Sequence, residues 1–207
     1  MKTTTLFATA LALSLAGISG ASAQEAGTMS LGLGLGGVMP KSDNGTILGG
    51  ANTLDIGDNV RPTITFEYFV ANNIGIEVLG AVPFMHDIDA SGLGRIGSTK
   101  HLPPVVSVQY HFNGGEQFSP FVGVGLNYTA FFEETAKGAI AGHDLDLSDS
   151  WGVALHAGFD YKISDHGAFR TDVRWIDIDS DVKLDGAKIG KAEIDPWVVG
   201  MSYVYTF

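Results

Sequence analysis

Large apolar side chains alternate with small, polar or charged ones along much of this chain, and that alternation limits the possible folds more than any other feature. In the segment MSYVYTF at 201–207, every second residue is large and apolar, and the residues between them are Ser202, Val204 and Thr206. A period of two places side chains on opposite faces of a β-strand, whereas a helix would repeat every 3.6 residues. The pattern predicts strands at about 28–39, 60–70, 74–84, 102–112, 120–132, 150–163, 168–179 and 195–207.

The connections between these eight segments alternate in length. Long connections lie at 40–59, 85–101, 133–149 and 180–194, and short ones lie at 71–73, 113–119 and 164–167. Each segment is about as long as a transmembrane β-strand of ~9–11 residues, or slightly longer. Outer-membrane barrels combine short periplasmic turns with longer outer loops. We therefore predict an all-β fold, an eight-stranded antiparallel up-and-down transmembrane β-barrel.

The positions of the aromatic residues distinguish a membrane barrel from a soluble one. A soluble barrel would bury the large apolar face and expose the charged one, so alternation alone allows both. Aromatic rings favour the two interfaces of a bilayer, and here they gather near the strand ends. The short-turn end carries Tyr68, Tyr110, Phe112, Tyr161, Phe169, Tyr203 and Phe207, and the long-loop end carries Trp151 and Trp197. This arrangement favours a lipid-facing apolar surface.

The first 23 residues have the layout of a secretory signal peptide. Lys2 precedes the apolar stretch LFATALALSLAGISG, and the small residues Ala21, Ser22 and Ala23 precede Gln24. An uncleaved N-terminal anchor is the alternative, although the apolar run is short for a span of ~20 residues. We expect a signal peptide at 1–23 and an exported outer-membrane β-barrel at 24–207.

The polar face of the strands predicts a charged cluster in the periplasmic half of the barrel. Eight strands enclose a space that side chains fill or that holds one small ligand. A buried charge must be paired or solvated, so a salt-bridged floor and a water-filled vestibule are both open. The predicted charged cluster contains Glu67, Glu77, Asp160, Lys162, Arg170, Asp172 and Arg174.

The same face becomes apolar toward the long-loop end. An apolar interior blocked by charges below would bind hydrophobic molecules and pass polar solutes poorly, because polar groups lose their hydration there. Plain core packing of a small barrel explains the pattern equally well. The predicted hydrophobic lumen contains Leu79, Ala81, Val105, Phe131, Ile176, Ile178 and Val198.

Catalysis and metal binding have weak support in the sequence. The candidate groups are His86, Asp87, His101, His143 and Asp144 in the long connections, and no nucleophile motif accompanies them. Exposed His and Asp side chains in acidic loops are usually solvated. With no cysteine in the chain, disulfides and thiolate chemistry are excluded. We predict no enzyme, no metal and no cofactor.

Several long motifs resemble the outer membrane protein W (OmpW) family of Gram-negative bacteria. They are NNIGIEVLGAVPFMHDI, LPPVVSVQYHF, PFVGVGLNYTAFFEE, DSWGVALHAGFDY and WIDIDS, followed by the terminal aromatic strand. The similarity runs from about Arg61 to Phe207 and is weaker from Gly27 to Pro40. It implies an eight-stranded outer-membrane barrel with a hydrophobic interior channel for small apolar molecules. It also implies that the terminal Tyr203, Tyr205 and Phe207 form the signal read by the outer-membrane assembly machinery.

One residue departs from the family pattern. Some members carry a bulky apolar residue inside the barrel where this chain has Arg174. A hydrophobic constriction opposite Leu79 is therefore in doubt, and Arg174 is expected to pair with Glu77 or Asp172.

Two functions follow as hypotheses. The first is passive uptake of small hydrophobic molecules with lateral release into the membrane, through an opening near Pro83, Pro103 and Pro104, where strand pairing would fail for lack of N–H donors. The second is a non-transporting surface barrel, acting as a phage or colicin receptor or as a stress-related structural protein. The expected partners are outer-membrane lipid, lipopolysaccharide, small hydrophobic solutes and the assembly machinery. A net charge of -11 argues against nucleic acid.

Overall fold

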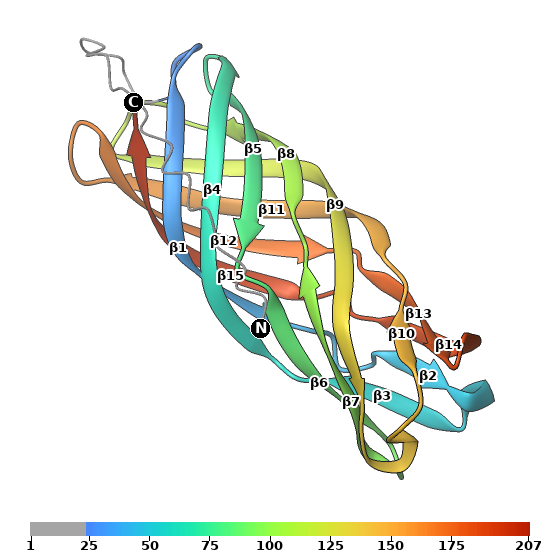
Figure 1. The fold of residues 1–207 in the computed structure, drawn as a ribbon. Helices are drawn as coiled ribbons and strands as arrows, with labels where there is room; N and C mark the ends of the chain where they lie inside the picture. The colour runs from blue at the N-terminus through green and yellow to red at the C-terminus, as the bar shows by residue number, and fades with distance from the viewer. Residues whose placement is uncertain (1–23) are drawn as a thin grey trace, which may run out of the picture.

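Residues 24–207, which the computed structural model describes, form a closed barrel (Figure 1). Its wall consists of β1 (Met29–Met39), β4 (Asn59–Ala71), β5 (Ile74–Ala81), β8 (Val105–His111), β9 (Phe118–Ala136), β11 (Ser150–Lys162), β12 (Gly167–Ile176) and β15 (Trp197–Thr206). Each wall strand pairs antiparallel with the next, and β15 pairs with β1 to close the cylinder, with Leu33 opposite Tyr203. The predicted eight-stranded antiparallel barrel is confirmed. The predicted signal peptide at 1–23 lies outside the described residues.

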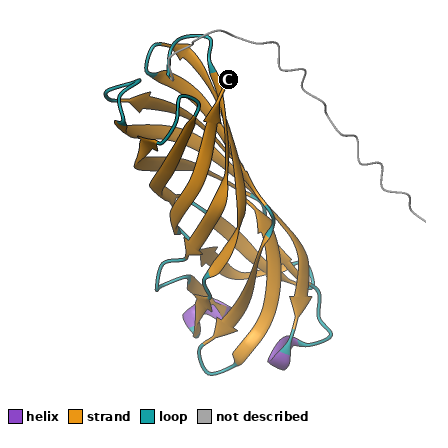
Figure 2. Cartoon of the chain, turned by 90° about the vertical axis from the view of Figure 1, so that its left-hand side faces the viewer, coloured by secondary structure: helices purple, strands orange, loops and turns teal. Residues whose placement is uncertain are grey.

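The long connections differ from the prediction, because they fold into further strands. β2 (Gly45–Ile47) pairs with β3 (Asn52–Ile56), β6 (Phe84–Ala90) pairs with β7 (Gly94–Leu102), and β13 (Asp179–Leu184) pairs with both β14 (Ala187–Glu193) and β10 (Leu145–Leu147). With the outer part of β9, these strands form the outer collar, at the end of the barrel opposite the C-terminus (Figures 1 and 2). Two short 3-10 turns, η1 (Leu48–Gly50) and η2 (Gly138–Ile140), lie in its connections.

The collar forms because the period of two continues beyond the predicted strands. In β6, every second residue from Phe84 to Ala90 is buried, and the residues between them are more exposed. Such a strand buries one face and solvates the other. The wall of the barrel therefore extends past the aromatic residues at the long-loop end.

The outward face of the wall is apolar and bounded by aromatic side chains. Met201 and Leu126 are more than 60% exposed, at 65% and 63%, and Trp151 at the long-loop end is 74% exposed. Tyr68, Tyr110, Phe169 and other rings are exposed at the short-turn end. A continuous apolar surface of this extent matches a bilayer, where it meets hydrocarbon instead of water. Within residues 24–207, no helix is long and apolar enough to span a membrane.

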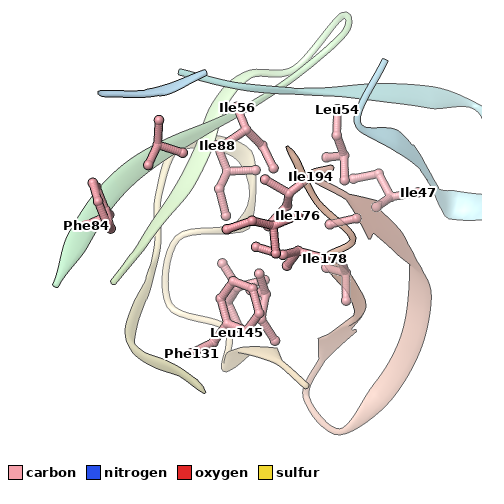
Figure 3. Packing of buried hydrophobic residues seen from close by; sticks show 14 of the residues in the cluster. Ile47, Leu54, Ile56, Phe84, Ile88, Phe131, Leu145, Ile176, Ile178 and Ile194 are labelled. Carbon is pink, nitrogen blue, oxygen red and sulfur yellow. The ribbon is translucent and has the colours of Figure 1, made fainter. Parts of the chain in front are cut away.

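The interior has two layers of different chemistry. The first, which we call the apolar core, lies in the outer collar and the adjoining wall, where isoleucine side chains from several strands converge (Figure 3). The second, which we call the ion-pair floor, lies toward the short-turn end and consists of Glu67, Glu77, Asp160, Arg170 and Arg174.

Candidate functional site

Arg170 on β12 is the centre of the ion-pair floor. Its Nε and Nη2 donate to the two Asp160 carboxylate oxygens at 2.7 and 2.9 Å. Nη1 donates to Glu77 at 2.9 Å, and Nη2 donates also to Glu67 at 3.0 Å. The guanidinium has five N–H donors in a rigid plane, which allows one side chain to serve three carboxylates. The floor thus joins β4, β5, β11 and β12.

Arg174 extends the floor toward the apolar core. Its Nη2 donates to Glu77 Oε1 at 2.7 Å, while its Nε lies 3.9 Å from Asp172. Each Glu77 carboxylate oxygen therefore accepts a hydrogen bond from a different arginine, Oε2 from Arg170 and Oε1 from Arg174. Of the two expected partners, the structure places Glu77 in hydrogen-bond contact and Asp172 at the limit of an ion pair. Nε and Nη1 of Arg174 have no hydrogen-bond partner among the described residues.

Imidazole and amide side chains complete the polar layer. His111 Nε2 lies 2.8 Å from Glu67 Oε1, and Gln109 donates to the same oxygen at 3.0 Å. His156 Nε2 donates to Gln109 Oε1 at 2.9 Å. The guanidinium carbon of Arg170 lies over the Phe121 ring, 4.8 Å from the centroid of that ring. These four residues were not in the predicted charged cluster, although Gln109, His111 and His156 share the inward parity of their strands.

Lys162 is the exception among the predicted charged residues. It makes no ion pair with any residue in 24–207, and lines a small pocket at the short-turn end with Gln24, Glu116 and Asp165. Its long side chain reaches the periplasmic mouth, where water can solvate the ammonium group. The structure thus joins five of the predicted residues, leaves Asp172 at the margin, and separates Lys162.

The predicted hydrophobic lumen lies within the apolar core. Val105, Ile176 and Ile178 are almost fully buried, and Leu79 and Ala81 are partly buried against them. Phe131 and Val198 belong to the same cluster. The sequence did not predict the collar half of this core, because its segments were predicted to be loops, apart from Phe84 at the end of the predicted strand 74–84. The missed residues include Ile47, Leu54, Ile56, Phe84, Ile88, Ile96, Leu145, Leu147, Val182 and Ile194.

A break interrupts the ladder between the third and fourth wall strands. The last pair of β5 and β8 is Leu79 with Val105, and pairing resumes at Phe84 with His101 in β6 and β7. We call the intervening segments, 80–83 and 102–104, the seam. Pro83, Pro103 and Pro104 lie in it, and each lacks the N–H that a ladder requires. The predicted strands 74–84 and 102–112 are therefore divided here.

Both edges of the seam are hydrogen-bonded to the neighbouring wall strands. Val82 donates its N–H to the Pro62 carbonyl at 3.0 Å, on the β4 side. The Pro104 carbonyl accepts from the Tyr128 N–H at 3.2 Å and from Asn127 Nδ2 at 3.0 Å, on the β9 side. The loss of pairing is thus confined to the seam and does not loosen the neighbouring strands.

The long-connection groups considered for catalysis separate into two environments. His86 and His101, expected to be solvated, are instead buried at 2% and 1% exposure, because β6 and β7 turn them into the collar. Burial, with a smaller contribution from His86, lowers the pKa of His101 to about 3. His143 is exposed and pairs with Asp185 at 2.7 Å. Within 24–207 these groups form no nucleophile–base–acid arrangement.

Three carboxylates, Asp177, Asp179 and Asp195, approach one another at the edge of the collar, with oxygens within 4.8 Å. Lys41 pairs with Asp195 at 3.0 Å, and Lys191 pairs with Asp179 at 2.6 Å. Lys41 also pairs with Glu193 at 2.7 Å, so the two lysines neutralise part of the negative charge of this cluster and leave less of it for a cation.

Comparison with known proteins places the chain in a family. The family model described as the OmpW family matches residues 25–207. Outer membrane protein W of Vibrio cholerae is 38% identical over 197 residues, covering 89% of this chain and 91% of that protein. Outer membrane protein W of Escherichia coli is 37% identical, with both chains covered completely. The crystal structure of the outer membrane protein OprG from Pseudomonas aeruginosa superposes with a TM-score of 0.80 at 31% identity, covering 90% of this chain and 98% of that one. This chain belongs to the OmpW family and is an outer-membrane β-barrel of a Gram-negative bacterium.

Proposed function

We propose that this barrel is a passive uptake channel for small hydrophobic molecules, which it releases sideways into the outer membrane. The observation that carries the proposal is an apolar interior in the collar that ends on a buried ion-pair floor. Moving an apolar solute from water into such an interior is favourable in proportion to the apolar area removed from water. A polar solute would lose its hydration without replacement.

The ion-pair floor makes a straight path to the periplasm unfavourable. The side chains of Arg170, Glu67 and Glu77 are all at most 3% exposed, and both carboxylates accept hydrogen bonds from Arg170. A hydrophobic solute has no groups to replace these bonds, and separating a buried pair costs about 3–5 kcal/mol. Solutes that enter the apolar core therefore need an exit above the floor.

The seam is the exit that we favour. In hydrocarbon, every unpaired backbone N–H costs several kcal/mol, so an open ladder is normally excluded from the lipid region. The prolines at 83, 103 and 104 have no N–H to leave unpaired, which lowers the cost of an opening at this place. Leu79 and Val105 lie at its lower margin and belong to the apolar core or pack against it. An apolar solute would thus pass from core to lipid with little contact with polar groups.

Uptake of radiolabelled naphthalene tests the channel. Cells with and without the protein are compared at matched outer-membrane integrity, and we expect faster uptake with the protein. L79W, which fills the lower margin of the seam, should reduce the protein-dependent part several-fold. L33W is the matched control, since Leu33 is 58% exposed on the lipid face.

Equal uptake with and without the protein, across several apolar compounds, would contradict the channel. The barrel would then be better explained as a non-transporting surface protein, whose collar strands present a firm surface to a phage, a colicin or a neighbouring component of the envelope.

A further inference from the structure

Two buried histidines lie at the upper margin of the seam with nitrogens that the protein leaves unpaired. His86 on β6 and His101 on β7 stack face to face, with ring centroids 4.9 Å apart and an interplanar angle of 5°. Phe84 stacks on His101 at 5.5 Å, and Phe131 packs against it at 5.7 Å. The pair is therefore a polar feature inside the apolar core, outside the ion-pair floor.

The hydrogen-bonding state of His86 follows from its neighbour. Its Nδ1 contacts the Gly57 carbonyl oxygen, which can only accept, so Nδ1 carries the hydrogen of the neutral ring. Nε2 is then a bare acceptor, buried and without a partner among residues 24–207.

His101 is wholly unpaired. Both its nitrogens are buried with no hydrogen-bond partner among the described residues. A neutral imidazole has one N–H donor and one acceptor, so the pair of rings offers two acceptors and one donor. Buried polar atoms are nearly always satisfied, and each unsatisfied one calls for a specific explanation.

The geometry excludes a metal ion as that explanation. Imidazole binds a metal through the nitrogen lone pair in the plane of the ring. The two rings are nearly parallel, at 5°, and their centroids lie 4.9 Å apart. The in-plane lone pairs of the two rings therefore do not converge on one ion. Within 24–207, no third His, Asp or Glu joins them in a group with metal-ligand spacing.

The surroundings also exclude an anion. Burial keeps both rings neutral at ordinary pH, since it lowers the pKa of His86 and that of His101. An anion would enter an apolar layer beside two neutral rings, and of the charged groups that act on His86, Asp58 and Asp87 would repel it while Arg61 would attract it, so its entry is unfavourable. A neutral group that both donates and accepts, such as a hydroxyl, matches the donor and acceptors on offer.

We propose that His86 and His101 each offer a hydrogen-bonding position for hydrophobic molecules that carry one neutral hydroxyl group, with the hydroxyl bonded to one ring at a time and the apolar part of the molecule in the apolar core. The inference rests on the proposed uptake function and specifies its substrate class. His101 pairs with Phe84 in the first register pair above the seam, so a solute leaving through the seam would pass this site. Alcohols would then be preferred over alkanes of the same length.

Imidazole nitrogen resonances test the site directly. The full chain, with ¹⁵N-labelled histidine and embedded in lipid nanodiscs, is titrated with 1-octanol or with octane as the matched control. We expect octanol to shift the ring nitrogens of His86 and His101, and octane to leave them in place. His143 and His166, both hydrogen-bonded to other groups and exposed, serve as internal references. No shift with octanol, or equal shifts with both compounds, would overturn the proposal.

Uptake measurements distinguish the proposed histidine site from the proposed channel function. The protein-dependent uptake of octanol relative to octane should fall about tenfold in H101F, which keeps an aromatic ring between Phe84 and Phe131. H143F should leave the ratio unchanged. If octane uptake depends on the protein but the ratio is the same in H101F, the channel stands and the histidine site is refuted. If H101F does not fold, the wild-type titration still decides.

Discussion

The Arg170 side chain on β12 donates a 2.9 Å hydrogen bond to Glu77 on β5, and these two strands lie on opposite sides of the barrel. Three wall strands separate β5 from β12 in each direction around the cylinder. The bond therefore spans the interior, and shows that at this level there is room only for side chains. A cylinder of this size is expected to be filled rather than open.

Replacing Arg170 should destabilise the barrel strongly. R170M leaves Glu67, Glu77 and Asp160 buried without their shared cation, and we expect a loss of about 3–5 kcal/mol in the free energy of unfolding. Urea unfolding in lipid vesicles measures it. K162M is the matched control, because Lys162 makes no ion pair with the described residues, and it should change stability by less than about 0.5 kcal/mol. Similar losses in both variants would refute the role of the floor.

Gly75 on β5 should be difficult to replace. A Cβ at this position would clash with the carboxylate and Cγ of Glu67, which Arg170 and His111 hold in place. G75A should cost about 1–3 kcal/mol, as overpacking of a filled interior does. In G37A the added Cβ would meet its nearest atoms at 3.7 and 3.9 Å, an ordinary contact, so its thermal unfolding should stay near the wild-type value. The idea fails if G75A unfolds like the wild type.

Joining the two edges of the seam should slow uptake. The chain has no cysteine, so A81C/P103C places the only two thiols where the β5–β8 register would continue. A short bifunctional thiol reagent that links them should reduce naphthalene uptake several-fold, and its cleavage should restore it. L35C/M201C joins residues that are already paired on β1 and β15, and linking those should have no effect. Unaltered uptake after linkage of the seam would exclude lateral release there.

The buried His101 should make the collar sensitive to acid. Its pKa is about 3 in the folded protein and about 6.5 when unfolded, so below pH 6.5 the unfolded chain binds the extra proton. Its contribution to stability is thus complete above pH 6.5 and falls toward pH 3, by at most about 1.4 kcal/mol per pH unit. Urea midpoints at pH 7.5 and 5.0 for wild type and H101F isolate the effect. A pH dependence that is equal in both proteins would argue against it.

The period of two explains most of what could be predicted. It identified the wall strands, the two faces of each strand, and all five residues of the ion-pair floor, since parity along a strand is a local property. It did not identify the partners of Arg170, which come from strands 10 to 103 residues away in the sequence. Nor did it place Lys162 outside the floor, because parity gives the side of the wall and not the depth that a long side chain reaches.

The alternation in the sequence determined the barrel and the change from a charged to an apolar interior, and the positions of the aromatic residues determined which face meets lipid. Only the tertiary structure decided that the long connections continue the wall as a collar, because short strands there are stable only when they pair with strands distant in the sequence. Tertiary packing also buried His86 and His101, since the polarity of a residue does not reveal which neighbours will cover it. The break at the seam depends on both the sequence and the tertiary structure. The sequence supplies prolines that lack backbone donors, and the strand register brings the two edges of the seam together.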